Sequence, residues 1–128
     1  MDKRIQKEKE MSFLLIFLSG MFEGYMDVLQ FHYAKFKKKH PKVDGFFWDA
    51  EISWVNKYDE NFKPKFFGST TFLVFLTDGW HLMKWLRNVC FFSCIVFIPD
   101  NFNMIILALI LYMTNRLGFN MIYKLIYK

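Results

Sequence analysis

Three apolar segments constrain the fold of this chain more than any other feature of its sequence. They occupy roughly residues 11–33, 69–98 and 101–118. A bilayer core is about 30 Å thick, and a helix needs about 20 apolar residues to cross it. Hydrophobic residues make up 54% of the 128 residues, which is more apolar surface than a soluble domain of this size can bury. We therefore predict an all-α membrane protein with about three transmembrane helices at these positions.

The chain is predicted to form a single membrane domain over residues 1–128, because no linker, repeat or low-complexity stretch divides it. We expect the first apolar segment to be retained and not cleaved as a secretory signal. No small-residue cleavage site follows Phe13–Phe17, and Glu23 and Asp27 interrupt the region where cleavage would fall.

The second segment has no helix breaker before Pro99 except Gly79, so a single helix there would be about 45 Å long. That length exceeds the hydrocarbon thickness, and the sequence leaves open whether one helix or two form. Ser69 is the predicted N-cap. The tripeptide from Pro99 to Asn101 predicts a turn, so we expect the second and third helices to form a hairpin.

The loop at 34–67 combines aromatic residues with a run of lysines, namely Lys35, Lys37, Lys38 and Lys39. Clustered lysines attract anionic headgroups, and Trp and Tyr favour the headgroup layer, so one interpretation is contact with anionic lipid. The other interpretation is a solvated charge run that only sets the orientation. In both cases the excess of lysine predicts a cytoplasmic, interfacial loop. Residues 119–128 are predicted to be an amphipathic extension of the third helix at the interface.

Polar residues inside the predicted spans form the most specific pattern, because an ionisable side chain at membrane depth is costly unless it is paired or wet. Counting about 1.5 Å per residue from the outer face places several of them at a similar depth. This polar belt consists of Glu23, Asp27, His81, Lys84, Arg87, Asn115 and Arg116. Gly20 and Gly24 share one stripe of the first helix, a spacing that lets another helix approach closely. We predict that this stripe faces the second helix.

Asp78 and His81 are three positions apart, so one helix face would present both side chains. Together with Glu23 and Asp27 they have the residue types of a carboxylate and imidazole metal site in a helix bundle. Asp27, Asp78 and His81 are therefore the candidate acid, base or ligand residues. The plainer interpretation is that the acidic residues neutralise the basic residues of the belt and fix the helix register. We predict no cofactor, with a divalent metal as the alternative.

A family resemblance rests on residues 46–58 and 65–82, which contain the motifs S-W-V-N-K-Y and L-T-D-G-W-H-L. These stretches resemble the signature region of uncharacterised small multi-spanning membrane proteins of Bacteroidetes-type bacteria. The resemblance covers about a quarter of the chain. It implies a membrane location and implies that the two motifs belong together, but it implies no activity.

Nucleic-acid binding is disfavoured, because only three of the 17 basic residues are arginine. We predict a small integral protein of the bacterial inner membrane with a helix-packing or assembly role and anionic-lipid contact. Its expected partners are membrane lipids and a second copy or another membrane protein. The alternative is a membrane-embedded enzyme that acts on a lipid or another interfacial substrate through the Asp78 and His81 pair.

Overall fold

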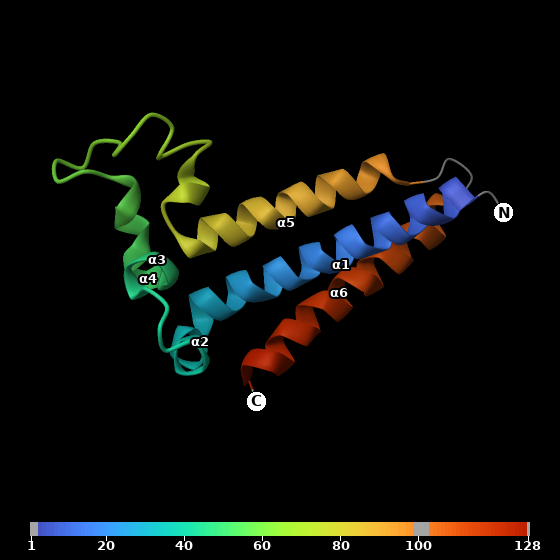
Figure 1. Cartoon of the computed structure of the whole chain (residues 1–128), viewed down its shortest axis with the longest axis horizontal. Coiled ribbons are helices and arrows are strands. Elements are labelled where there is room, and N and C mark those ends of the chain that lie inside the picture. Colours follow the sequence, from blue (N-terminus) through green and yellow to red (C-terminus); the bar gives the residue numbers. More distant parts are fainter. Residues whose placement is uncertain (1–2, 99–102, 128) are drawn as a thin grey trace.

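The computed structural model describes residues 3–98 and 103–127, and within these ranges the chain is helical with no β-sheet. Three long helices form the body of the molecule: α1 (Lys3–Phe31), α5 (Gly79–Val96) and α6 (Met104–Tyr127). Residues 32–78 form a head at one end of the body (Figure 1). The head contains α2 (Tyr33–Lys39), α3 (Gly45–Trp48), α4 (Ala50–Ser53) and the 3₁₀ turns η1 (Trp54–Lys57) and η2 (Val74–Leu76).

The central element of the body is α1, which lies between α5 and α6 (Figure 1). It packs along both helices, whereas direct contact between α5 and α6 is slight. The second and third helices of the expected hairpin therefore pack against α1 more than against each other. The reason is that α1 presents small buried residues on its faces, namely Ser12, Ser19, Gly20 and Gly24, so each neighbour gains more contact with α1 than with the other.

Two helices among the described residues are long and apolar enough to cross a membrane, α1 and Met104–Ile126 within α6. The α5 helix is not one of them, because Lys84, Arg87 and Asn88 make its first half polar. Large apolar side chains point away from the body on both α5 and α6. Val96 is 78% exposed and Ile105 is 74% exposed. A helix bundle in water would bury such faces, whereas lipid solvates them.

The second helix is ten residues shorter at its start than the sequence predicted. Residues 68–78 form turns and η2, and α5 begins at Gly79. Asp78, not Ser69, is the N-cap: its extended backbone precedes the helix, and its carboxylate accepts a hydrogen bond from the His81 amide at 2.9 Å. Ser69 is instead buried and donates its hydroxyl to the Lys57 carbonyl at 2.8 Å.

The third helix is longer than predicted at its C-terminal end. The α6 helix starts with Asn103 capping the amides of Ile105 and Ile106, and it continues without a break to Tyr127. Gly118 does not end the helix. The described part of the predicted extension, residues 119–127, is thus part of α6 itself, and its Ile122 and Ile126 are buried. The predicted turn at 99–101 lies outside the described residues.

The main hydrophobic core lies where the end of α1 meets the head, the start of α5 and the end of α6. Val28 and Leu29 are fully buried there beside Phe36, Met83 and Ile122. Aromatic rings of the head cover this core, among them Trp48, which is 5.9 Å from Phe36 between ring centroids. The core therefore fixes the head against all three long helices.

Candidate functional site

The crossing of α1 and α6 depends on glycine. The Gly20 backbone lies against the Asn115 carbonyl, and Gly118 lies against the Phe17 carbonyl. A Cβ atom at Gly24 would meet the Phe119 carbonyl oxygen at 3.0 Å. The Gly20 and Gly24 stripe therefore faces α6, so the prediction that it faces the second helix is wrong. The spacing signals close approach but carries no information about which helix approaches.

One ion pair of the polar belt joins α1 to α6. The Arg116 guanidinium contacts the Glu23 carboxylate at 2.5 Å, and both side chains are about one-third exposed. Arg116 also bonds to the Asn115 side-chain oxygen at 2.7 Å and stacks over the Phe119 ring at 4.7 Å. This pair fixes the register of the two helices beside the glycine crossing.

A cleft of about 560 Å³ opens between the three long helices. Its walls are mostly apolar, with Ile16 from α1, Phe91 and Ile95 from α5, and Leu111 from α6 among them. Its polar part includes Glu23, Arg87, Asn88 and Asn115. The structure therefore brings part of the predicted belt together at one level, from all three helices.

The remaining belt residues lie elsewhere. Asp27 accepts a hydrogen bond from the Tyr123 hydroxyl of α6 at 3.4 Å. Lys84 is exposed on α5, with its ammonium 5.1 Å from the centroid of the Trp80 ring. His81 turns toward the head. The seven residues of the predicted belt are thus divided among separate surroundings and do not form one buried cluster.

Asp78 and His81 form a dyad at the junction of head and body. His81 Nδ1 lies 2.7 Å from an Asp78 oxygen, and the Thr77 hydroxyl bonds to the same carboxylate at 3.3 Å. Asp78 is only 1% exposed, so these donors and the capped amide replace the water it loses. With Nδ1–H donating to Asp78, the other ring nitrogen of His81 is a proton acceptor.

The dyad opens onto a second hollow of about 300 Å³. Gln30, Glu51, Trp54 and Trp80 also line it. The α1 residue at this hollow is Gln30, so Asp27 and Glu23 do not join Asp78 and His81 there. No group of three or more metal-ligating side chains forms anywhere in residues 3–98 and 103–127. The predicted four-residue combination is therefore not assembled in this part of the chain.

The four lysines of the predicted run, Lys35, Lys37, Lys38 and Lys39, divide into two kinds. Lys37 donates to the Val43 carbonyl at 2.5 Å, and Lys39 donates to the Leu125 carbonyl near the end of α6. Lys35 and Lys38 are exposed on α2. Lys37 and Lys39 therefore stabilise the fold. Lys37 joins α2 to the segment before α3, and Lys39 satisfies a carbonyl in the last turn of α6 that the helix leaves without a partner.

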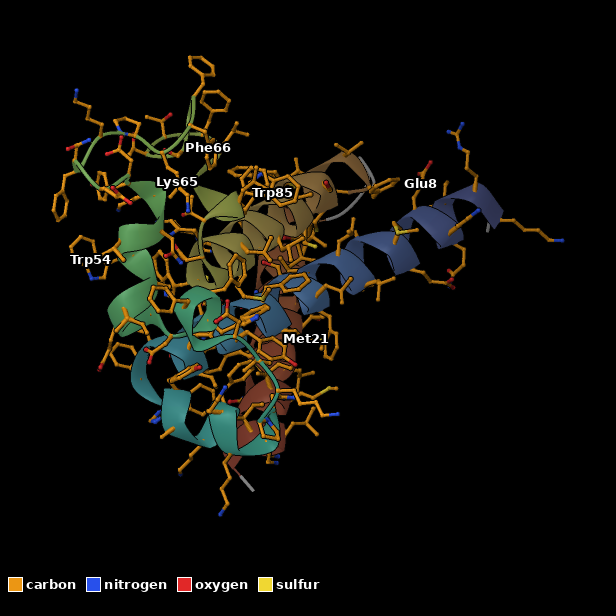
Figure 2. The ribbon with its side chains drawn as sticks, turned by 60° about the vertical axis from the view of Figure 1, so that its left-hand side comes forward. Glu8, Met21, Trp54, Lys65, Phe66 and Trp85 are labelled. Atoms are coloured by element: carbon orange, nitrogen blue, oxygen red, sulfur yellow. The ribbon has the colours of Figure 1, made fainter. Side chains whose placement is uncertain are left out.

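Aromatic side chains project from the head. Phe62 is 72% exposed and Phe67 is 86% exposed. Trp54, Lys65 and Phe66 lie on the head in Figure 2, whereas Glu8 lies near the opposite end of α1. Exposed aromatic rings with lysines between them are typical of a surface that meets lipid headgroups.

Sequence reasoning missed the residues that hold the head together. The Asn56 amide donates to the Phe46 carbonyl at 2.5 Å and to the Thr77 carbonyl at 3.2 Å, so it joins α3 to the segment before α5. Ser53 is buried near the dyad. The two motifs quoted for the family resemblance are therefore in direct contact through Asn56. A short buried polar side chain has no periodicity that would reveal its partner.

Comparison of the chain with protein family models, with curated proteins and with solved structures found no match.

Proposed function

We propose that this chain is an integral membrane protein whose three long helices cross the bilayer and whose head binds anionic lipid at one membrane surface. The observation that carries the proposal is the position of the exposed apolar residues. They cover α5 and α6 along the outside of the body and recur as aromatic rings on the head. In this role the protein is a packing or assembly component of the bacterial inner membrane and not an evident enzyme.

The proposal makes α5 the third membrane span. Its 18 residues correspond to about 27 Å, close to the hydrocarbon thickness. Its apolar half, with Phe92, Ile95 and Val96 exposed, would lie in the hydrocarbon. Its polar half adjoins the head, where Trp80 and Lys84 would lie in the headgroup layer.

Alkaline extraction of membranes tests the integral location. We expect the full chain to remain in the membrane pellet after carbonate treatment, because two apolar helices and the exposed face of α5 hold it there. Release into the supernatant would contradict the proposal. Cysteine labelling at position 67 and at position 7 from each side of sealed vesicles then tests the topology, since the head and the start of α1 should label from opposite sides.

The lipid contact rests on exposed lysines of the head, chiefly Lys38 and Lys42, because Lys37 and Lys39 are bonded within the fold. Each lysine near an anionic surface contributes about 1 kcal/mol. In proteoliposomes with spin-labelled lipids, we expect the double change Lys38→Gln and Lys42→Gln to reduce the preference for anionic over zwitterionic lipid several-fold. The matched control, Lys3→Gln with Lys7→Gln, should reduce it less, because Glu8 and Glu10 offset the charge there.

A second candidate function is acid–base chemistry on an interfacial substrate, and the Asp78 and His81 dyad favours it specifically. Asp78 orients the imidazole, and the hollow beside it is lined by Trp54 and Trp80 at the membrane surface. We expect His81 to react with diethyl pyrocarbonate faster in the native chain than in Asp78→Asn, with Asp44→Asn as the control. Equal rates in all three proteins would remove the support for an activated histidine.

A further inference from the structure

The cleft between the three long helices combines an apolar wall with a cluster of hydrogen-bond donors. The Arg87 side chain donates through Nε and a terminal nitrogen to the Asn88 oxygen, at 3.2 and 2.9 Å. The Arg116 side chain occupies the Asn115 oxygen in the same way. Because a guanidinium group only donates, both asparagines must turn their oxygens toward the arginines. Their amide NH₂ groups therefore remain as donors at the cleft.

The charge of the cleft is positive. Glu23 is the acidic residue of its wall, and Arg116 neutralises it at 2.5 Å. Arg87 has no carboxylate partner among the residues that the structure describes. A half-buried guanidinium beside apolar walls is costly without an anion. Arg87 with the two asparagine amides thus forms a set of donors that suits a carboxylate and excludes a cation.

The apolar wall continues from this cluster toward the other end of α5. From Arg87 to Val96 the helix advances about 14 Å, and Ile98 continues the wall beyond its end, so the wall lines much of the length of an extended acyl chain. The volume of about 560 Å³ lies within the usual range for sites that bind one small ligand. A single chain fits this space better than the two chains of a phospholipid.

From these observations we propose that the cleft binds one long-chain fatty acid from the bilayer, with its carboxylate on Arg87 and its acyl chain along α5 and α6. The site depends on the packing of the three helices and not on the contact of the head with lipid headgroups. A negative result for one proposal therefore leaves the other standing.

The test measures binding of oleate and of oleyl alcohol to the full chain in nanodiscs, at a pH where the fatty acid is ionised. A hydrogen-bonded charge pair predicts that the wild-type protein binds oleate about tenfold or more tightly than the alcohol. Arg87→Gln should abolish this preference. Lys84→Gln, which removes a positive charge from an exposed site on the same helix, should retain it.

Two further variants keep the test decisive if Arg87→Gln fails to fold. Asn88→Asp preserves an oxygen acceptor for Arg87 but supplies its missing carboxylate, so it should also abolish the preference for oleate. Ala108→Trp fills the cleft and should weaken binding of both ligands, because Ala108 lines the wall.

Three results would overturn the proposal. One is equal affinity of the wild-type protein for oleate and the alcohol. Another is a loss of preference in Lys84→Gln as large as in Arg87→Gln. The third is displacement of oleate by an anionic phospholipid at equal concentration, which would assign the cluster to a lipid headgroup instead.

Discussion

The body and the head of this molecule are stabilised in different ways. In the body, α1 and α6 cross at glycines and the outer faces are apolar. In the head, side chains such as Asn56 and Ser69 bond to backbone carbonyls of distant segments. The body therefore depends on close backbone approach and leaves apolar faces exposed, whereas the head depends on particular polar contacts. A substitution in one region should therefore change stability and hydrogen exchange in that region and not in the other.

The largest expected effect is at the crossing of α1 and α6. In Gly20→Ala or Gly118→Ala, the added methyl meets backbone atoms of the facing helix, which cannot rotate away. We expect a loss of about 1–3 kcal/mol, against a gain in helix propensity of about 1 kcal/mol at most. Thermal unfolding in detergent measures the loss.

Gly45→Ala is the control, because its methyl would meet only the Tyr33 hydroxyl, at 3.4 Å. If the Gly118→Ala protein unfolded at the same temperature as the wild type, α1 and α6 would lie farther apart at the crossing than they do in the structure.

A smaller effect is expected at the junction of the two regions. Asp78→Ala removes the N-cap of α5 and the partner of His81, at a cost of about 1–2 kcal/mol. Amide hydrogen exchange should become faster over residues 79–82, while the crossing of α1 and α6 keeps its protection. Asp44→Ala, which uncaps the short helix α3, serves as the comparison. Faster exchange throughout the body would mean that junction and body are not separable.

Within the head alone, Asn56→Ala removes two bonds to the Phe46 and Thr77 carbonyls. We expect a loss of about 1 kcal/mol, seen as faster exchange over residues 74–78 without a change in α6. Asn61→Ala changes an exposed asparagine nearby and should leave exchange unaltered. Equal effects of the two substitutions would argue against Asn56 as the link between the segments.

The smallest expected effect is the ionisation of Tyr33. Burial of the phenol, with the nearby carboxylates of Asp49 and Asp44, raises the pKa of Tyr33 above its ordinary value. The neutral form is therefore favoured by folding, and the stabilisation is present below about pH 10 and is lost as the pH rises through the folded-state pKa. Ultraviolet titration should show that the wild type has one tyrosine that ionises at a higher pH than the others, and that this tyrosine is missing in Tyr33→Phe.

The sequence predicted the body better than the head for a physical reason. Apolar length alone identifies α1 and α6, because a helix is the structure that satisfies its own backbone in lipid. The same argument extended the second helix too far, since residues 69–78 are apolar enough for a helix. The helix instead begins where the Asp78 side chain caps the His81 amide, and Asp78 is buried at the junction with the head.

The candidate site was predictable in its residue types but not in its grouping. Counting depth along each helix grouped Glu23 with Arg116 and Arg87. In the structure Glu23 bonds to Arg116 and lines the same cleft as Arg87. The depth of a residue along a helix does not say in which direction its side chain points. The predicted belt therefore grouped Asp27 with His81, although Asp27 contacts Tyr123 on α6. Asn115 belonged to the predicted belt and Asn88 did not, because the role of each asparagine in the cleft depends on which arginine its oxygen meets.

The glycine crossing also has a consequence for the order of assembly during synthesis. Chains emerge from the ribosome N-terminus first, so α1, the head and α5 exist before the α6 segment has been made. Until then the face of α1 at Gly20 and Gly24, which packs against α6 in the finished molecule, is uncovered. The tightest interface of the finished molecule is therefore the last to close, and the nascent protein exposes a binding surface that the mature protein covers with its own final helix.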